Sequence, residues 1–195
     1  MKIVLSIVAV FLVLILPSCS GEEYTTRTSD INLFINEEYA KETDDYYKSI
    51  AGKNAQDFFP PYNEIEYKYT EISFYTYACA DFFVYPDYTY VLELVFDDET
   101  EYEKAKADIH SIYDFLQEPI ANKSEMPACE YQINKFLVKI LTEGADDNFP
   151  HSVYAICEND KEHVIRYLYL YDIDHDILVI SDFAEAVVRY TSCTW

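Results

Sequence analysis

The sequence predicts an α+β fold: an antiparallel β-sheet with one long helix (about 99–117) and an N-terminal helix packed on it. Two observations lead to this prediction. Short runs of alternating aromatic or aliphatic residues, which are typical of half-buried strands, lie on both sides of a segment with clear helical periodicity. The expected elements also follow one another as helix, strands, helix, strands and short helix, an order that indicates helices on one face of an antiparallel sheet.

The N-terminal helix is expected to begin at Ser29 or Asp30 and to end at Gly52. Residues 58–61 (FFPP) then predict an extended junction, because proline restricts its own backbone and that of the residue before it. The apolar stripe that predicts the helix consists of Ile31, Phe34, Ile35, Tyr39, Tyr46 and Ile50.

Strands are predicted between this junction and the long helix. Residues 64–70 alternate apolar and polar side chains, which predicts the first strand. The aromatic run 73–85 predicts one or two further strands. Residues 88–96 (YTYVLELVF) are apolar on both faces except at Glu93, so we expect a central strand there.

The long helix has the most regular apolar pattern in the chain. Asp98 followed by Glu101 predicts a capping box at its N-terminus, and Pro119 is expected to end it. The acidic run DDETEYE also resembles a metal-binding cluster, but we favour capping because carboxylates are stabilised at the positive end of a helix dipole. The apolar face consists of Tyr102, Ala105, Ile109, Ile112, Tyr113 and Leu116.

The C-terminal part predicts further strands and a last helix. Residues 158–161 (ENDK) form a turn between two of these strands. Ser181 is expected to cap a short helix that runs to Tyr190. The strands are expected at residues 131–141, 153–157, 163–171 and 177–180.

Residues 1–18 predict a secretory signal peptide. Lys2 supplies a positive charge, and residues 3–16 are apolar apart from Ser6, a run too short to cross a membrane comfortably as a helix. The signal is followed directly by a cysteine, Cys19, and the residues around the cleavage point decide how the protein is processed.

Leu16-Pro17-Ser18-Cys19 resembles the lipobox of bacterial lipoproteins, with Pro17 departing from the residues usual at that position. The resemblance implies that the signal is removed before Cys19, that the Cys19 thiol is lipidated, and that acyl chains hold the protein on the extracytoplasmic face of the cell membrane. The alternative is a secreted protein that is cleaved after Ser20.

This resemblance covers the N-terminus alone, and no family is identified for the mature domain. We expect a signal peptide at residues 1–18, a polar tether at residues 19–30, and a single α+β domain at residues 31–195. No repeat or low-complexity segment interrupts that domain.

Four cysteines remain beyond the one in the lipobox, an even number that suits disulfide formation outside the cytoplasm. Sequence does not rank the three connectivities; we favour Cys79–Cys129 with Cys157–Cys193. The alternative is four reduced, buried thiols that pack as small hydrophobic residues.

The chain is strongly acidic, with 36 Asp and Glu residues against 14 Lys and Arg residues and a formal net charge of −22. Such a field repels phosphate groups, so we exclude nucleic acid as a partner. It favours cationic partners, divalent ions or solubility, and we favour solubility.

Tyrosine is also abundant, with 20 residues in the chain. Several alternate along the expected strands, and an exposed row of rings could bind a glycan or an extended peptide. We favour a simpler explanation, in which tyrosine serves as a strand former that tolerates partial burial.

Asp172, Asp174 and Asp176 are the candidate metal ligands, because alternating carboxylates can converge on a calcium ion. However, Ile177 and Phe183 stand where an EF-hand loop requires glycine and glutamate. We therefore favour a solvated turn and predict no cofactor.

Cys157 and His163 flank a predicted turn as a nucleophile and its base would, but no third group that orients the histidine is identified. The chain has only three glycines, which excludes a glycine-rich phosphate loop. We predict no catalytic residue.

These observations predict a membrane-anchored extracytoplasmic lipoprotein with a binding or accessory role. Its partners would be the membrane, through the lipid anchor, and an envelope protein, a peptide or a glycan. The alternative is a small secreted envelope hydrolase with an unrecognised site.

Overall fold

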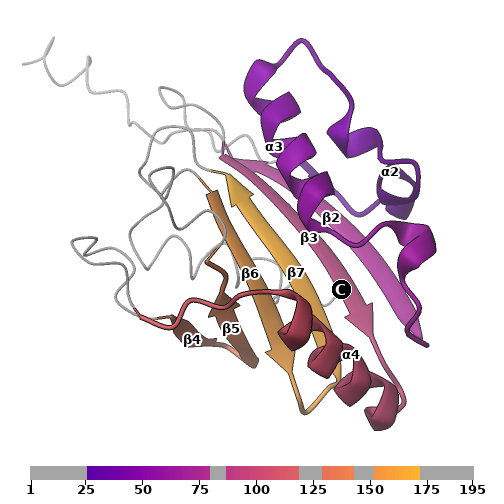
Figure 1. The fold of residues 1–195 in the computed structure, drawn as a ribbon. Coiled ribbons are helices and arrows are strands. Elements are labelled where there is room, and N and C mark those ends of the chain that lie inside the picture. The colour runs from indigo at the N-terminus through magenta and orange to yellow at the C-terminus, as the bar shows by residue number, and fades with distance from the viewer. Residues whose placement is uncertain (1–25, 80–86, 119–128, 143–151, 172–195) are drawn as a thin grey trace, which may run out of the picture.

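The computed structural model describes residues 26–79, 87–118, 129–142 and 152–171. In this part of the chain, seven strands form one antiparallel sheet in the order β1-β2-β3-β7-β6-β5-β4, with helices on one face (Figure 1). The α+β class and the antiparallel sheet are therefore confirmed. The strands are β1 (Thr26–Thr28), β2 (Glu71–Cys79), β3 (Asp87–Val95), β4 (Glu130–Ile133), β5 (Phe136–Ile140), β6 (Ser152–Asn159) and β7 (Val164–Tyr171).

The centre of the sheet is formed by β3, β7 and β6. β3 pairs with β7 from Tyr88↔Tyr171 to Val95↔Val164, and β7 pairs with β6 through a tight hairpin. Nearly every residue of these strands is buried, in agreement with the expected central strand at 88–96. Their apolar side chains on both faces explain the continuous hydrophobic pattern.

The N-terminal helix is shorter and more broken than expected. The chain forms α2 (Ile31–Ile35), the 3-10 helix η1 (Glu38–Ala40) and α3 (Tyr46–Phe58) in place of one helix. Glu37 adopts a left-handed backbone with φ 55°, which breaks the first helix, and Asp45 caps the next one. The expectation that Gly52 ends the helix is wrong, because Gly52 lies in the middle of α3.

The expected long helix at 99–117 is also shorter. α4 spans Glu99–Ile112, and Tyr113 has an extended backbone. The chain after it pairs with the sheet instead, because the Leu116 amide donates to the Ile140 carbonyl and Phe115 forms a bridge with Leu141. Asp98 caps the helix as expected, because its side chain accepts a hydrogen bond from the Thr100 amide. The expected capping box is not completed by Glu101, whose carboxylate contacts the amide and the ammonium group of Lys68.

Two predicted strands differ from the structure. Residues 65–70, expected as a strand, lie outside any helix or strand after the 3-10 helix η2 (Tyr62–Glu64). The predicted strand 131–141 is a hairpin of β4 and β5, whose turn contains Asn134 with a positive φ of 54°. The strand expected at 177–180 and the helix expected after Ser181 lie outside the described residues.

The sheet carries a different apolar cluster on each face. The helix-covered face is aromatic and joins residues of α2, α3 and α4 to strand residues such as Phe74 and Tyr167. On the other face, the buried members of the cluster all lie on strands and are mostly aliphatic, for example Val91 and Leu168. α2 and α3 lie towards one end of the sheet and α4 towards the other (Figure 1).

Candidate functional site

A pocket of about 360 Å³ lies between the N-terminal helices and the β1–β2–β3 side of the sheet. Its volume is in the range of small-molecule binding sites. α2, η1 and the start of α3 form one wall, and β1, β2 and β3 form the other. The lining combines hydroxyl, carboxylate and apolar groups: Thr28, Leu33, Glu38, Tyr39, Thr43, Asp45, Lys48, Thr76, Tyr77, Ala78, Tyr88 and Tyr90.

Asp45 links the two walls of the pocket. Its Oδ1 accepts a hydrogen bond from the Lys48 amide at 3.1 Å, which caps α3, and its Oδ2 accepts one from the Tyr88 hydroxyl at 2.5 Å. Burial raises the pKa of the Asp45 carboxyl, but these hydrogen bonds outweigh burial and hold the pKa below its ordinary value. Asp45 is therefore an anion at neutral pH.

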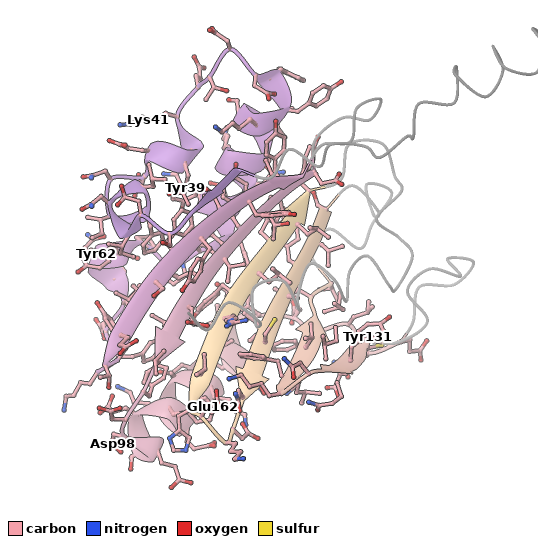
Figure 2. All side chains as sticks on the ribbon, turned by 180° about the vertical axis from the view of Figure 1, so that it is seen from behind. Tyr39, Lys41, Tyr62, Asp98, Tyr131 and Glu162 are labelled. Atoms are coloured by element: carbon pink, nitrogen blue, oxygen red, sulfur yellow. The ribbon has the colours of Figure 1, made fainter. Side chains whose placement is uncertain are left out.

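Tyr39 and Tyr90 line the pocket with nearly buried rings, 7% and 2% exposed. Tyr39 lies on η1 among the N-terminal helices (Figure 2), and its ring centroid is 5.8 Å from that of Tyr90. Neither hydroxyl has a hydrogen-bond partner among the described residues. Burial raises the pKa of both groups, so each presents a neutral hydroxyl at physiological pH.

The position of Tyr39 depends on a close approach between η1 and α3. A Cβ added at Gly52 would lie 2.0 Å from the Tyr39 carbonyl oxygen and 3.2 Å from the Ala40 Cα. Only a residue without a side chain allows the two backbones to pack at this distance. Gly52 therefore holds one wall of the pocket in place.

A second polar group of residues lies between α4 and β6. The carboxylate of Glu158 is 3% exposed and contacts three cationic or imidazole side chains. The His110 Nε2 contacts its Oε1, the Lys139 Nζ lies 3.4 Å from its Oε2, and the Lys106 Nζ lies 3.9 Å from the same oxygen.

Asp160 extends this second group on the turn after β6. Its Oδ1 accepts hydrogen bonds from the Lys106 ammonium and from the Tyr102 hydroxyl, each at 2.6 Å. The Lys106 bond and then the Tyr102 bond hold the pKa of Asp160 below its ordinary value. Because the anions and cations compensate one another, the arrangement is that of an ion-pair network that fastens α4 to the sheet.

Most of the site residues predicted from the sequence lie outside the pocket or outside the described residues. Cys19, Cys193 and the side chain of Cys79 lie outside the described residues, so lipidation and disulfide pairing stay predictions. Cys129 and Cys157 carry free thiols in the structure. Burial raises the pKa of the Cys157 thiol to about 12, a value at which it is protonated and unreactive at neutral pH.

The Cys157–His163 pair does not assemble. Cys157 belongs to the aliphatic face of the sheet, whereas the His163 ring packs 5.3 Å from the Tyr102 ring of α4 on the other face. The metal candidates Asp172, Asp174 and Asp176 lie outside the described residues. Within the described ranges, no group of three or more His, Cys, Asp or Glu side chains could hold a metal ion.

In the described part of the chain, the tyrosines of the expected strands do not form an exposed row. Tyr167 and Tyr169 are 2% and 0% exposed and belong to the aromatic core, while Tyr75 and Tyr77 pack partly buried on the other face. The interpretation of tyrosine as a core and strand residue is confirmed for these positions.

Comparison of the chain with known protein families, with curated proteins and with solved structures finds no match. None of the helices in the described ranges has the length and apolar character needed to cross a membrane. The pocket is the feature of the described residues that could hold a ligand.

Sequence reasoning missed the pocket, because its lining comes from segments that are far apart in the chain. One local signal was present. Thr43 and Asp45 precede the apolar residues of α3, and such a pair is typical of a helix start. That signal would have separated α3 from the preceding helix and placed an acidic cap at the pocket.

Proposed function

We propose that this chain is a membrane-anchored extracytoplasmic lipoprotein that binds a small polar ligand and catalyses no reaction. The observation that carries the binding role is the pocket of about 360 Å³, which two tyrosines with nearly buried rings, Tyr39 and Tyr90, line without a hydrogen-bond partner for their hydroxyls among the described residues. Ligand sites are typically apolar cavities with a few polar groups that fix the ligand, and unpaired hydroxyls on the pocket wall suit that arrangement.

The proposed anchor lies close to this pocket in the sequence. Thr28 lines the pocket and follows the lipobox cysteine, Cys19, by nine positions. A chain of that length spans at most about 30 Å. The pocket would therefore stay near the membrane surface and receive ligands from the envelope.

Mass spectrometry of the mature N-terminus tests the anchor. The protein is expressed in a bacterial host, and wild type is compared with Cys19→Ala after extraction with a phase-separating detergent. We expect an acylated Cys19 at the N-terminus and partition into the detergent phase, both abolished by the substitution. A free N-terminus at Gly21 with partition into the aqueous phase would show secretion instead.

A fragment screen by NMR tests the binding role. Small polar molecules are added to the ¹⁵N-labelled protein, and chemical-shift changes are mapped onto the sequence. We expect changes concentrated at the pocket, for example at Thr43, Lys48 and Thr76. Changes confined to other surfaces, or none with any fragment, would contradict the proposed function.

The alternative of an envelope hydrolase has one feature in its favour, the contact between His110 and the buried carboxylate of Glu158. A histidine oriented by a carboxylate is part of many hydrolytic sites. Here the same Nε2 lies 3.3 Å from the Lys139 ammonium, and the described residues give this imidazole no hydrogen bond to a serine hydroxyl or a thiol. The pocket supports binding better than this pair supports catalysis.

A further inference from the structure

We propose that the pocket selects small organic cations, in particular hydroxylated molecules that carry a protonated amine. This inference rests on the proposed binding function and names the ligand class of the same site. It follows from the charges that line the pocket, from the acceptors that those groups still offer, and from the charge of the whole chain.

The lining charges favour a cation. Glu38 and Asp45 contribute two carboxylates, whereas Lys48 contributes one ammonium group. The whole chain has a formal net charge of −22, and a field of that sign concentrates cations and repels anions. An anionic ligand would therefore meet repulsion both from the pocket and from the rest of the protein.

The acceptors around the pocket suit an ammonium group, which has three donors to satisfy. The Asp45 carboxylate accepts hydrogen bonds from the Tyr88 hydroxyl and from the backbone of Lys48 and Tyr47, and of the roughly four lone-pair sites of a carboxylate this leaves one for a ligand. Among the described residues, the Glu38 carboxylate pairs with Lys41 at 3.5 Å in an exposed ion pair, which a ligand can replace at little cost.

The hydroxyls suit the rest of such a ligand. Tyr39 and Tyr90 can both accept and donate, and Thr43 and Thr76 line the same space. Their rings are too deeply buried to offer a flat face, so a sugar held mainly by stacking fits less well. A hydroxylated amine combines the required charge with groups that these hydroxyls can bind.

A substitution of Lys48 provides a second test, because its expected effect on binding is opposite to that of a substitution of Glu38. Lys48 lines the same pocket as Asp45, and its ammonium is the cation of the pocket lining that can compensate the Asp45 charge in place of a ligand, in line with its small lowering effect on the pKa of Asp45. Removal of this charge should strengthen binding of a cation, while removal of the Glu38 charge should weaken it. A general disturbance of the pocket would weaken binding in both variants.

The experiment uses three probes with the same ring and different charge: glucosamine, glucose and glucuronate. They are titrated by NMR into the full-length protein in detergent at low salt. We expect glucosamine to bind at least about tenfold more tightly than glucose, and glucuronate to bind more weakly than both. High salt should reduce the preference for glucosamine.

Variants identify the groups responsible. We expect Glu38→Gln to weaken glucosamine binding about two- to fivefold and Lys48→Gln to strengthen it by a similar factor, as for partly exposed charges. Glu130→Gln on β4, at the opposite edge of the sheet, is the matched control and should change affinity little. Circular dichroism of each variant verifies that it remains folded.

The outcomes separate this inference from the proposed function. Equal binding of glucose and glucosamine, a preference for glucuronate, or weakening by both Glu38→Gln and Lys48→Gln would overturn the ligand class while leaving the pocket as a binding site. Absence of any shift at pocket residues with these probes and with the wider fragment set would overturn the binding role itself.

Discussion

Replacement of Gly52 by alanine tests the packing that holds the pocket wall. In an exposed helix position this change would stabilise the protein by about 1 kcal/mol, because alanine has the higher helix propensity. In this structure the new Cβ would lie 2.0 Å from the Tyr39 carbonyl oxygen and 3.0 Å from the Tyr39 carbonyl carbon. Both contacts are with backbone atoms, which cannot rotate away.

The size of the destabilisation depends on how far the backbone must move to relieve this contact. To reach an ordinary contact of 3.4 Å, α3 and η1 must separate by about 1.4 Å, the difference between that distance and the present one. Ala51, Ala55 and the Tyr39 ring, which lies 4.8 Å from the Phe74 ring, would all lose close packing. Overpacking typically costs about 1–3 kcal/mol, and a clash between backbone atoms lies at the upper end of that range. After the gain in helix propensity we expect a net loss of about 2 kcal/mol.

Denaturant unfolding followed by circular dichroism measures this loss in the full-length protein. A thermal scan should show a midpoint lower by about 4–8 °C for a chain of this size. Lys53→Ala is the matched control, since it changes the neighbouring exposed residue of α3 and should alter stability by less than about 0.5 kcal/mol. A Gly52→Ala protein as stable as wild type, or more stable, would refute the close approach.

Four further substitutions and one labelling experiment test the polar contacts and the thiols. Tyr102→Phe should cost about 1 kcal/mol in urea unfolding, because the hydroxyl that donates to Asp160 is lost; an unchanged midpoint would contradict this bond. The lowered pKa of Asp160 stabilises the fold above about pH 4, and this contribution is lost as the pH falls through the folded-state pKa. Asp160→Asn should therefore reduce stability at neutral pH and have little effect near about pH 2, whereas an equal loss at both would argue against the ion pair. Glu158→Gln should cost about 1–3 kcal/mol, because it leaves the surrounding cations without their shared carboxylate, and Glu66→Gln at an exposed position outside this ion-pair network is its control. In the reduced, folded protein Cys157 should resist alkylation at pH 8 while Cys129 reacts, as read by peptide mass spectrometry; modification of Cys157 at the rate seen in the unfolded chain would show that it is not buried.

Elements whose periodicity matches their burial could be predicted from the sequence. The hydrophobic runs of β3, β6 and β7 are buried on both faces, and the capped start of α4 places its apolar residues Tyr102, Ala105 and Ile109 in the core. In these elements local pattern and tertiary packing agree, so the pattern was sufficient.

Alternation proved ambiguous at residues 65–70. Tyr67 and Tyr69 are half-buried against the aromatic core, as a strand would place them, but the segment has no place in the sheet. An alternating pattern of apolar and polar residues indicates that every second side chain is buried. It does not report whether a neighbouring strand is available to pair with the backbone.

Backbone geometry caused the remaining errors. The left-handed residue Glu37 and the capping residue Asp45 divide a stripe that reads as one helix, and Gly52 acts as a contact residue in place of a helix end. The pocket could not be predicted for the same reason, since it forms where these broken pieces meet strands that lie about 30 to 60 positions further along the chain. Only the acidic cap had a local signal.

The abundance of tyrosine also has an explanation in this structure, through α3. At its N-terminus the Tyr88 hydroxyl donates to the capping carboxylate of Asp45, and at its C-terminus the Tyr113 hydroxyl donates to the Phe58 carbonyl at 2.9 Å. The first bond holds the capping carboxylate in place, and the second pairs a carbonyl that the end of the helix leaves free; phenylalanine would bury the same ring without making either bond. Tyrosine fills the aromatic layer and also supplies a polar group at its boundary with the helices.

Tyr39 and Tyr90 differ from these tyrosines, and the difference points to the pocket as the binding site. Their rings are as deeply placed in the aromatic layer as those of the tyrosines that tie down α3, yet neither hydroxyl is paired within the described part of the chain. Phenylalanine would pack equally well at both positions if packing were their only role. Because the two hydroxyls line the same pocket, a ligand that binds them accounts for tyrosine at positions where the fold alone does not require it.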